Sequence, residues 1–183
     1  MSALLDRLIE DHRRLEYVMD LLTALLDRFR AGEEPDYGLM CEVLEYMIDY
    51  SDQVHHPSEE LIFERLFAVS GENPDLLRRV MRQHEQLSQL NRRFRESLEG
   101  IMHEEVLPRD EVELQGREML SLLREHIELE NTRAFPFAAA QLTAEDWADI
   151  ETRVPQAQDP VFGQADPQRF RALYARLKDQ LGE

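Results

Sequence analysis

Hydrophobic residues recur along the chain at alternating spacings of three and four, the period of one face of an α-helix. The first such stripe lies within residues 2–30. It consists of Leu5, Leu8, His12, Leu15, Met19, Leu22, Leu26 and Phe29. Similar stripes occupy residues 36–69, 74–102 and 109–140. The second stripe consists of Leu44, Ile48, Ser51, His55, Glu59, Ile62 and Leu66. The pattern therefore predicts four long helices.

Turn and cap residues separate these stripes. Gly32 follows the first stripe, and Asn73 followed by Pro74 supplies a cap and a first helical residue for the third. Pro57 lies inside the second stripe, where it lacks an N–H group and crowds the carbonyl of Gln53. We therefore expect a kink or a local irregularity near residue 57.

Four long helices joined by short turns favour an up-down-up-down four-helix bundle over residues 1–140. Residues 141–183 differ in kind, because a capping box from Thr143 to Asp146 opens a short helix and prolines then mark a loop. Phe170, Leu173 and Leu177 suit a last short helix. The predicted fold is all-α, with residues 141–183 as a C-terminal extension that packs on the bundle.

Length, net charge and cysteine content limit the kinds of protein that this chain can be. The length of 183 residues suits one domain, and a net charge of −17 argues against nucleic acid or an anionic membrane as a partner. Cys41 is the only cysteine, so an intrachain disulfide is impossible and a reducing compartment fits best. No apolar run approaches the ~20 residues of a membrane span. We expect a soluble, cytoplasmic protein, whose oligomeric state the sequence does not indicate.

Polar residues interrupt the hydrophobic stripes at their centres, and most of them are histidines. Five of the six histidines lie there, and two of them, His55 and His126, precede by four residues a glutamate on the same stripe. The set is His12, His55, His56, Glu59, His84, His126 and Glu130. One core histidine alone is usually a hydrogen-bonded structural residue, but buried imidazoles and carboxylates without partners are costly. Together they predict a polar, multivalent occupant of the core, and a pair of metal ions meets that requirement.

The positions of these residues are consistent with a single site. At 1.5 Å per residue, the histidines of the four helices lie roughly 14 to 21 Å from the same end of the bundle. Residues four apart share a helix face, so each histidine–glutamate pair converges on one point. Glu60 follows His56 by four residues but lies off the stripe of Ile62, so Glu59 is the preferred ligand.

Five imidazoles and two carboxylates exceed what one ion of four to six coordination needs. They suit two ions, with Glu59 and Glu130 as bridges between them. Nitrogen and oxygen ligands without a thiolate favour iron or manganese over structural zinc, although zinc stays an alternative.

These residues lie in segments that resemble bacterial members of the hemerythrin family, known as the HHE cation-binding domain. The segments are Asp11-His12-Arg13-Arg14-Leu15, residues 55–63 (HHPSEELIF), His84-Glu85 and residues 126–130 followed by Phe135-Pro136. The resemblance implies a four-helix bundle around two non-haem iron ions, bridged by carboxylates and an oxo or hydroxo group. It also implies O2, NO or peroxide as the small-molecule ligand.

Two positions depart from the pattern of the oxygen-carrying members. Those members have a histidine at the position of Ser88 and an aspartate at the position of Asn131. Here His56 restores the count of five imidazoles, and Glu130 supplies the second carboxylate. The departures weaken the case for reversible oxygen carriage, which depends on the geometry around the metal.

The sequence leaves several functions open. The first is a di-iron protein that binds O2, NO or peroxide for sensing or detoxification. A second is an enzyme that decomposes peroxide or reduces nitric oxide at the same centre. A third is a metal-dependent module that signals iron or oxygen status, and a metal-free helical bundle is the simplest alternative. The residues alone do not decide whether the protein is an enzyme.

Overall fold

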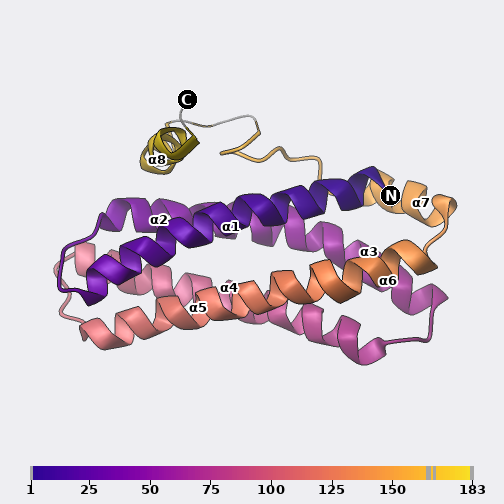
Figure 1. Cartoon of the computed structure of the whole chain (residues 1–183), viewed down its shortest axis with the longest axis horizontal. Helices are drawn as coiled ribbons and strands as arrows, with labels where there is room; N and C mark the ends of the chain where they lie inside the picture. Colours follow the sequence, from indigo (N-terminus) through magenta and orange to yellow (C-terminus); the bar gives the residue numbers. More distant parts are fainter. Residues whose placement is uncertain (1, 164–165, 167, 182–183) are drawn as a thin grey trace.

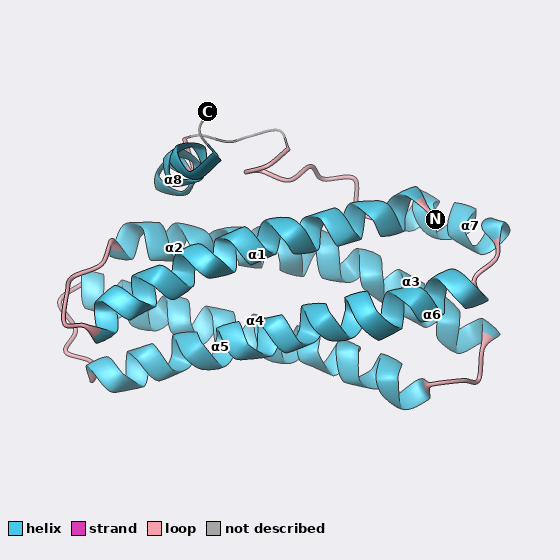
Figure 2. Ribbon diagram, in the orientation of Figure 1, coloured by secondary structure: helices cyan, strands magenta, loops and turns pink. Residues whose placement is uncertain are grey.

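The computed structural model describes residues 2–163, 166 and 168–181, and within them all regular structure is helical. Four antiparallel helical rods lie side by side (Figures 1 and 2). The first rod is α1 (Ala3–Arg30), and the third is α4 (Pro74–Met102). The second consists of α2 (Tyr37–Tyr46), η1 (Met47–His55) and α3 (His56–Val69). The fourth consists of α5 (Arg109–Leu129), η2 (Glu130–Ala134) and α6 (Phe135–Gln141). The predicted up-down-up-down bundle is confirmed.

The rods begin and end largely where the sequence indicates. Ser2 Oγ accepts a hydrogen bond from the backbone N–H of Leu4, and Asp36 accepts one from Leu39. Gly32 ends the first rod with a φ of 86°, a conformation that glycine adopts without strain. Asn73 occupies the predicted cap position but makes no capping side-chain bond. Its backbone has a φ of 50° instead, in the left-handed region that asparagine tolerates.

Two π-helical segments, η1 and η2, interrupt the second and fourth rods. The N–H of His56 donates to the carbonyl of Ser51, and the N–H of Phe135 donates to that of Glu130, five residues back in each case. Each segment ends two residues before a proline, Pro57 or Pro136. A wider turn leaves room for a ring that would crowd the preceding α-helical turn. The irregularity predicted at residue 57 is therefore a π-helix, and an equivalent one at residue 136 was not predicted.

The π-helix η1 changes which residues of the second rod face the core. An uninterrupted α-helix would place Ile48 on the buried stripe, but the structure leaves Ile48 only partly buried. Met47 and Tyr50 are buried instead. The predicted register is therefore wrong at this point, because each π turn holds more residues than an α turn. His55 and Glu59, on the far side of η1, are both buried as expected.

A polar belt divides the hydrophobic core into two clusters. One cluster includes Leu4, Leu8 and Ile62, and the other includes Leu15, Leu87 and much of the opposite half of the bundle. The seven histidines and glutamates predicted to bind metal belong to neither cluster and are all buried. The fold therefore surrounds these residues with apolar side chains from both sides.

The C-terminal segment contributes α7 (Ala144–Arg153) and α8 (Arg171–Leu181). The predicted capping box of α7 is present between Thr143 and Asp146. α7 lies beside the start of α1, and α8 packs near α2 at the other half of the bundle (Figure 1). Ile150 and Leu173 are fully buried in the two core clusters. A domain boundary at residue 140 stays a prediction.

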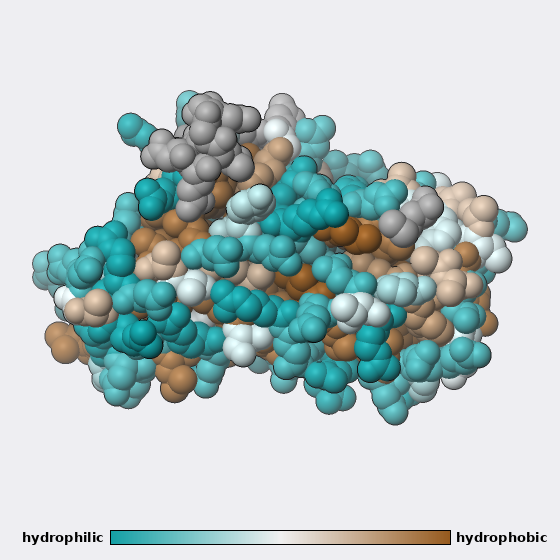
Figure 3. All heavy atoms as spheres, viewed as in Figure 1, coloured by the Kyte–Doolittle hydropathy of each residue, from teal (hydrophilic) through white to brown (hydrophobic). Residues whose placement is uncertain are grey.

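Hydrophilic side chains cover most of the face in Figure 3, with small apolar patches between them. Among the described helices, none has both the length and the apolar character that crossing a membrane requires.

Gly116 lets α5 approach its neighbours closely. A Cβ atom there would lie 2.8 Å from Leu26 Cδ1 and 2.8 Å from Phe94 Cζ, in the packed core. We expect Gly116→Val to lower the free energy of unfolding by about 1–3 kcal/mol, measured by chemical denaturation. Gly71→Val is the control, because a Cβ at Gly71 has nothing within 4 Å. Equal stability of the two variants would contradict this account of the packing.

Candidate metal centre

The polar belt brings together side chains from all four rods. α1 supplies His12, η1 supplies His55, and α3 supplies His56 and Glu59. His84 comes from α4, His126 from α5 and Glu130 from η2. Each of the seven residues is exposed to solvent by 6% or less. The structure therefore places every predicted ligand in one buried region.

One group of potential ligand atoms lies between α1 and the second rod. Glu59 Oε1 is 3.4 Å from His12 Nε2 and 3.1 Å from His55 Nε2. The three ligand atoms lie within 4.8 Å of one another. Two imidazoles and a carboxylate oxygen thus converge on one point.

A second group faces the other side of the same carboxylate. His56, His84 and His126 offer nitrogens that lie, with an oxygen of Glu59, within 4.8 Å of one another. Glu59 Oε2 is 3.3 Å from His84 Nε2. The rings of His56 and His84 stack with their centroids 4.2 Å apart. This group offers three imidazoles where the first offers two.

Glu130 also reaches both groups. Its Oε2 is 3.3 Å from His12 Nε2 and 3.1 Å from His126 Nε2, and its Oε1 is 3.5 Å from His84 Nε2. Each glutamate therefore contacts histidines of both groups. Two carboxylates between two sets of imidazoles form an arrangement that can bridge a pair of metal ions.

Unpaired polar atoms support metal occupancy of this region. The Nε2 atoms of His12, His55, His84 and His126, and both carboxylate oxygens of Glu59 and Glu130, are buried without a hydrogen-bond partner. Native proteins rarely leave buried polar atoms unpaired, because each one costs free energy. Two cations among these nitrogens and oxygens would satisfy them together, so the residues fit a binuclear metal site.

Every histidine of the site turns its second ring nitrogen toward an oxygen atom of an outer residue. Such contacts hold the proton on Nδ1 and leave Nε2 free to bind a metal. The Nδ1 partners of His12, His55, His56, His84 and His126 are Asn131 at 2.9 Å, Asp11 at 3.4 Å, Asp52 at 3.5 Å, Glu60 at 3.4 Å and Gln83 at 3.3 Å.

The helical pattern of the sequence did not predict these outer residues as partners of the histidines. Glu60 was considered as a ligand, and the structure places its half-exposed carboxylate behind His84, on the side away from the ligand cluster. Asn131, where oxygen-carrying relatives have an aspartate, instead supports His12. The sequence offered one indication of these partners. Asp11 and Gln83 each stand directly before a candidate ligand in the chain.

Ser88 explains how His56 can take the place of the missing histidine. Its hydroxyl donates to Asp52 Oδ2 at 2.7 Å, while Asp52 Oδ1 faces His56 Nδ1. Ser88 therefore orients Asp52, and Asp52 in turn orients His56.

Burial and charge determine the protonation of the site without metal. Burial lowers the pKa of His12, but the carboxylates of Glu130 and Glu59 outweigh burial and raise it to about 10. Burial and the neighbouring Glu59 raise the pKa of Glu130, but His126 and His12 outweigh them and hold it at about 2. Burial lowers the pKa of His126 to about 3. A proton on His12 thus replaces part of the positive charge that metal would supply.

The family profile for the hemerythrin HHE cation binding domain matches residues 3–138. The chain belongs to this family. Comparisons with the curated proteins and with the solved structures find no match. The matched range contains all seven candidate ligands and ends before the C-terminal segment.

The HHE domain is linked to the C-terminal segment through the outer residues of the site. Asp11 accepts hydrogen bonds from His55 and from the hydroxyl of Tyr50. Arg14 lies 3.4 Å from Asp11 Oδ1 and 3.5 Å from Asp159 Oδ2, so one guanidinium joins the two buried carboxylates. Asp159 also accepts from Tyr46 at 3.0 Å. Asp159 lies outside the family match and is therefore connected through Arg14 to Asp11, the partner of His55.

The two adjacent glutamates, Glu59 and Glu60, should differ in their effect on metal content. Glu59→Ala removes a carboxylate shared by both groups and should lower bound metal from two ions toward one or none per chain. Glu60→Ala, the matched control, removes only a partner of His84 Nδ1 and should retain both ions. Elemental analysis of the purified variants measures the difference. Metal loss in Glu60→Ala with a full complement in Glu59→Ala would reverse the assignment.

Metal binding at this site should be coupled to the loss of a proton from His12. Because the pKa of His12 is raised to about 10, this imidazole is protonated at neutral pH and must lose its proton to bind metal. Metal binding should therefore release protons, and the apparent affinity should increase as pH rises toward about 10. Calorimetric titration in two buffers of different ionisation enthalpy measures the release. A heat of binding that is the same in both buffers would contradict the prediction.

Proposed function

We propose that the chain holds two non-haem iron ions and that this centre binds a small oxidant, O2, NO or peroxide, for sensing or detoxification. The observation that carries the proposal is the pair of buried carboxylates, each in contact with both histidine groups. When bound, iron would supply a redox-active Lewis acid to which a small oxidant can add. Imidazole and carboxylate donors without a thiolate suit iron.

The two groups differ in how many donors the protein offers. With both carboxylates shared, the group of His12 and His55 offers one imidazole fewer than the group of His56, His84 and His126. An ion with fewer protein ligands keeps a position for an external molecule. The ligand-binding position is therefore assigned to the side of His12 and His55.

The surroundings of that side favour a small molecule over a large substrate. The ring of Phe135 stacks on His12 with centroids 5.3 Å apart. The His12 nitrogens face the partly buried Asn131 and the fully buried Glu130. Apolar clusters on both sides of the belt limit the entry of water. Low polarity strengthens electrostatic interactions at the centre and protects a reactive oxidant from side reactions.

A metal-dependent signalling role is the second candidate, and the contact chain from His55 to Asp159 favours it. Asp11 and Arg14 connect a candidate ligand to the C-terminal segment, so a change at the metal can alter how that segment docks. An enzyme that decomposes peroxide or reduces nitric oxide would use the same centre. Release of O2 from hydrogen peroxide with repeated turnover would identify the peroxide-decomposing enzyme.

The proposal predicts two iron ions per chain in protein produced with adequate iron. Elemental analysis gives the stoichiometry, and an optical spectrum of anaerobically reduced protein exposed to air reports the reaction with oxygen. New near-ultraviolet and visible bands are expected on exposure, and the Glu59→Ala variant should lack them. A content near one ion, or zinc alone under iron-replete conditions, would overturn the proposal.

Removal of the metal should lower the melting temperature, because ligands from all four rods are joined through it. Binding at a concentration 100 times the dissociation constant contributes about 2.7 kcal/mol. For a chain of this size, each kcal/mol corresponds to about 2–4 °C. Thermal denaturation before and after chelation measures the change, with metal content determined in parallel. An unchanged melting temperature after complete metal loss would show that metal and fold are not coupled.

A further inference from the structure

Two buried tyrosines of the second rod lie beside the candidate metal centre and are not among its candidate ligands. Tyr46 ends α2 and Tyr50 lies in η1, and a spacing of four residues puts both phenols on one face of the rod. They are 1% and 5% exposed. Their rings stack with centroids 5.9 Å apart and an interplanar angle of 9°. The two rings therefore form one aromatic pair in the core.

Each phenol donates a hydrogen bond to a different buried carboxylate. Tyr50 donates to Asp11 Oδ2 at 3.0 Å, and the same oxygen lies 3.4 Å from Nδ1 of His55. Tyr46 donates to Asp159 Oδ2 at 3.0 Å. A continuous series of contacts thus runs from a candidate metal ligand through both phenols to the C-terminal segment.

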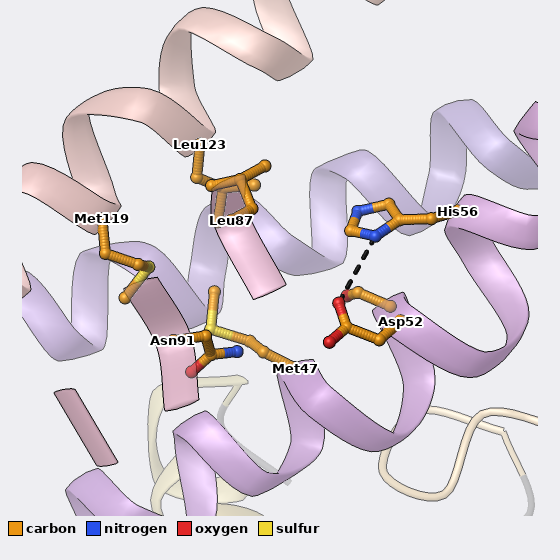
Figure 4. Close-up of a pocket in the computed structure, with 8 residues that line it drawn as sticks. Met47, Asp52, His56, Leu87, Asn91, Met119 and Leu123 are labelled. Carbon is orange, nitrogen blue, oxygen red and sulfur yellow. Dashed lines mark ion pairs between the residues drawn. The ribbon is translucent and has the colours of Figure 1, made fainter. Parts of the chain in front are cut away.

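A phenol is not needed to orient the carboxylate behind a metal ligand. On the three-histidine side, Asp52 faces His56 (Figure 4) and accepts a hydrogen bond from the Ser88 hydroxyl. On the two-histidine side, the donor to Asp11 is the phenol of Tyr50. A phenol loses an electron far more readily than an aliphatic alcohol does. Tyr50 therefore brings redox chemistry that orientation of the carboxylate does not require.

The carboxylates can accept the protons that the phenols release on oxidation. Burial and the neighbouring Asp159 raise the pKa of Tyr46, and burial and Asp11 likewise raise the pKa of Tyr50. Both phenols are therefore protonated at neutral pH. Removal of an electron makes a phenol a strong acid, so its proton passes to a base that is hydrogen-bonded to it. Burial raises the pKa of Asp159 against the hydrogen bonds that it accepts, which favours proton acceptance there.

The ring of Tyr46 is the more enclosed of the two. Phe162 and Phe170 contact it edge to face, with centroids 6.0 and 6.3 Å away. Its acceptor is also held in place, because Asp159 Oδ1 accepts from the N–H groups of Val161 and Phe162, both at 2.8 Å. An unpaired electron on Tyr46 would be shielded from solvent and from reaction with another molecule.

We propose that Tyr46 and Tyr50 form a one-electron redox site that exchanges electrons with the metal centre through Asp11 and His55. Tyr46 gives one electron, by way of Tyr50, to the oxidised metal centre. Its phenolic proton moves to Asp159, which leaves a neutral tyrosyl radical beside a protonated carboxyl group. Return of one electron and of that proton restores the phenol. The inference rests on the proposed function for its oxidant alone.

A photochemical oxidant tests the site without iron. The full chain is prepared with redox-inert zinc in place of its metal, and a ruthenium(III) polypyridyl complex generated by a light flash removes one electron. Electron paramagnetic resonance identifies the radical, and transient absorption gives its decay. We expect a radical on Tyr46 that decays several-fold more slowly than a radical on Tyr17, which is 53% exposed.

Matched variants assign the signal and the proton acceptor. Tyr46→Phe and Tyr17→Phe each remove one phenol oxygen, and the slowly decaying signal should be lost in the first and retained in the second. Asp159→Asn keeps the size of the side chain and an oxygen acceptor, but an amide is a much weaker base than a carboxylate. This variant should lower the radical yield several-fold. Thermal denaturation shows that each variant is folded.

The iron form tests the connection to the metal centre. Anaerobically reduced protein is exposed to air, frozen at successive times and examined by electron paramagnetic resonance. The Tyr46 radical should form, and Tyr50→Phe should slow its formation several-fold while Tyr17→Phe leaves the rate unchanged. A protein with two iron ions that reacts with oxygen and forms no Tyr46 radical would overturn the exchange with the metal centre.

The outcomes in the zinc form separate this inference from the proposed function. Equal slow signals in the wild-type chain and in Tyr46→Phe would overturn the redox site, as would an unchanged yield in folded Asp159→Asn. Absence of a Tyr46 radical in the zinc form would also overturn it, even for a chain shown to bind two iron ions. A Tyr46 radical in a chain that fails to bind iron would support the redox site while the proposed function fails.

Discussion

The structure depends on balancing the charge of two carboxylates buried in an apolar core. Glu59 and Glu130 are fully buried, and histidine nitrogens surround both. Two ionised carboxylates so close together require positive charge, which protonated imidazoles supply without metal and metal ions supply with it. That requirement explains why the core is split by a polar belt and why all four rods contribute to the belt.

The outer residues determine which ring nitrogen of each histidine faces the centre of the site. Each histidine presents one nitrogen to the centre because its other nitrogen is held by an oxygen from a separate side chain. Among these outer residues, Asp52 faces His56 and accepts a hydrogen bond from Ser88.

Both histidine–glutamate pairs adjoin a π-helix that precedes a proline. In the second rod η1 ends at His55, and Ser51, His55 and His56 are all buried. In the fourth rod Glu130 is the first residue of η2, and its carbonyl accepts the five-residue hydrogen bond. π-Helical segments are rare and often mark functional sites, because they redirect side chains without breaking the helix.

The sequence alone determined the four helices, their order and the seven polar residues of the belt, because helical periodicity and the high cost of burying charged groups are local signals. It also indicated an irregularity at Pro57. Only the tertiary structure decided which residues around Ile48 face the core, since Met47 and Tyr50 are buried there instead and no α-helical period describes the π-helix η1. The partners Asn131, Asp52 and Asp159 likewise depend on which rods become neighbours, and that follows from packing in three dimensions.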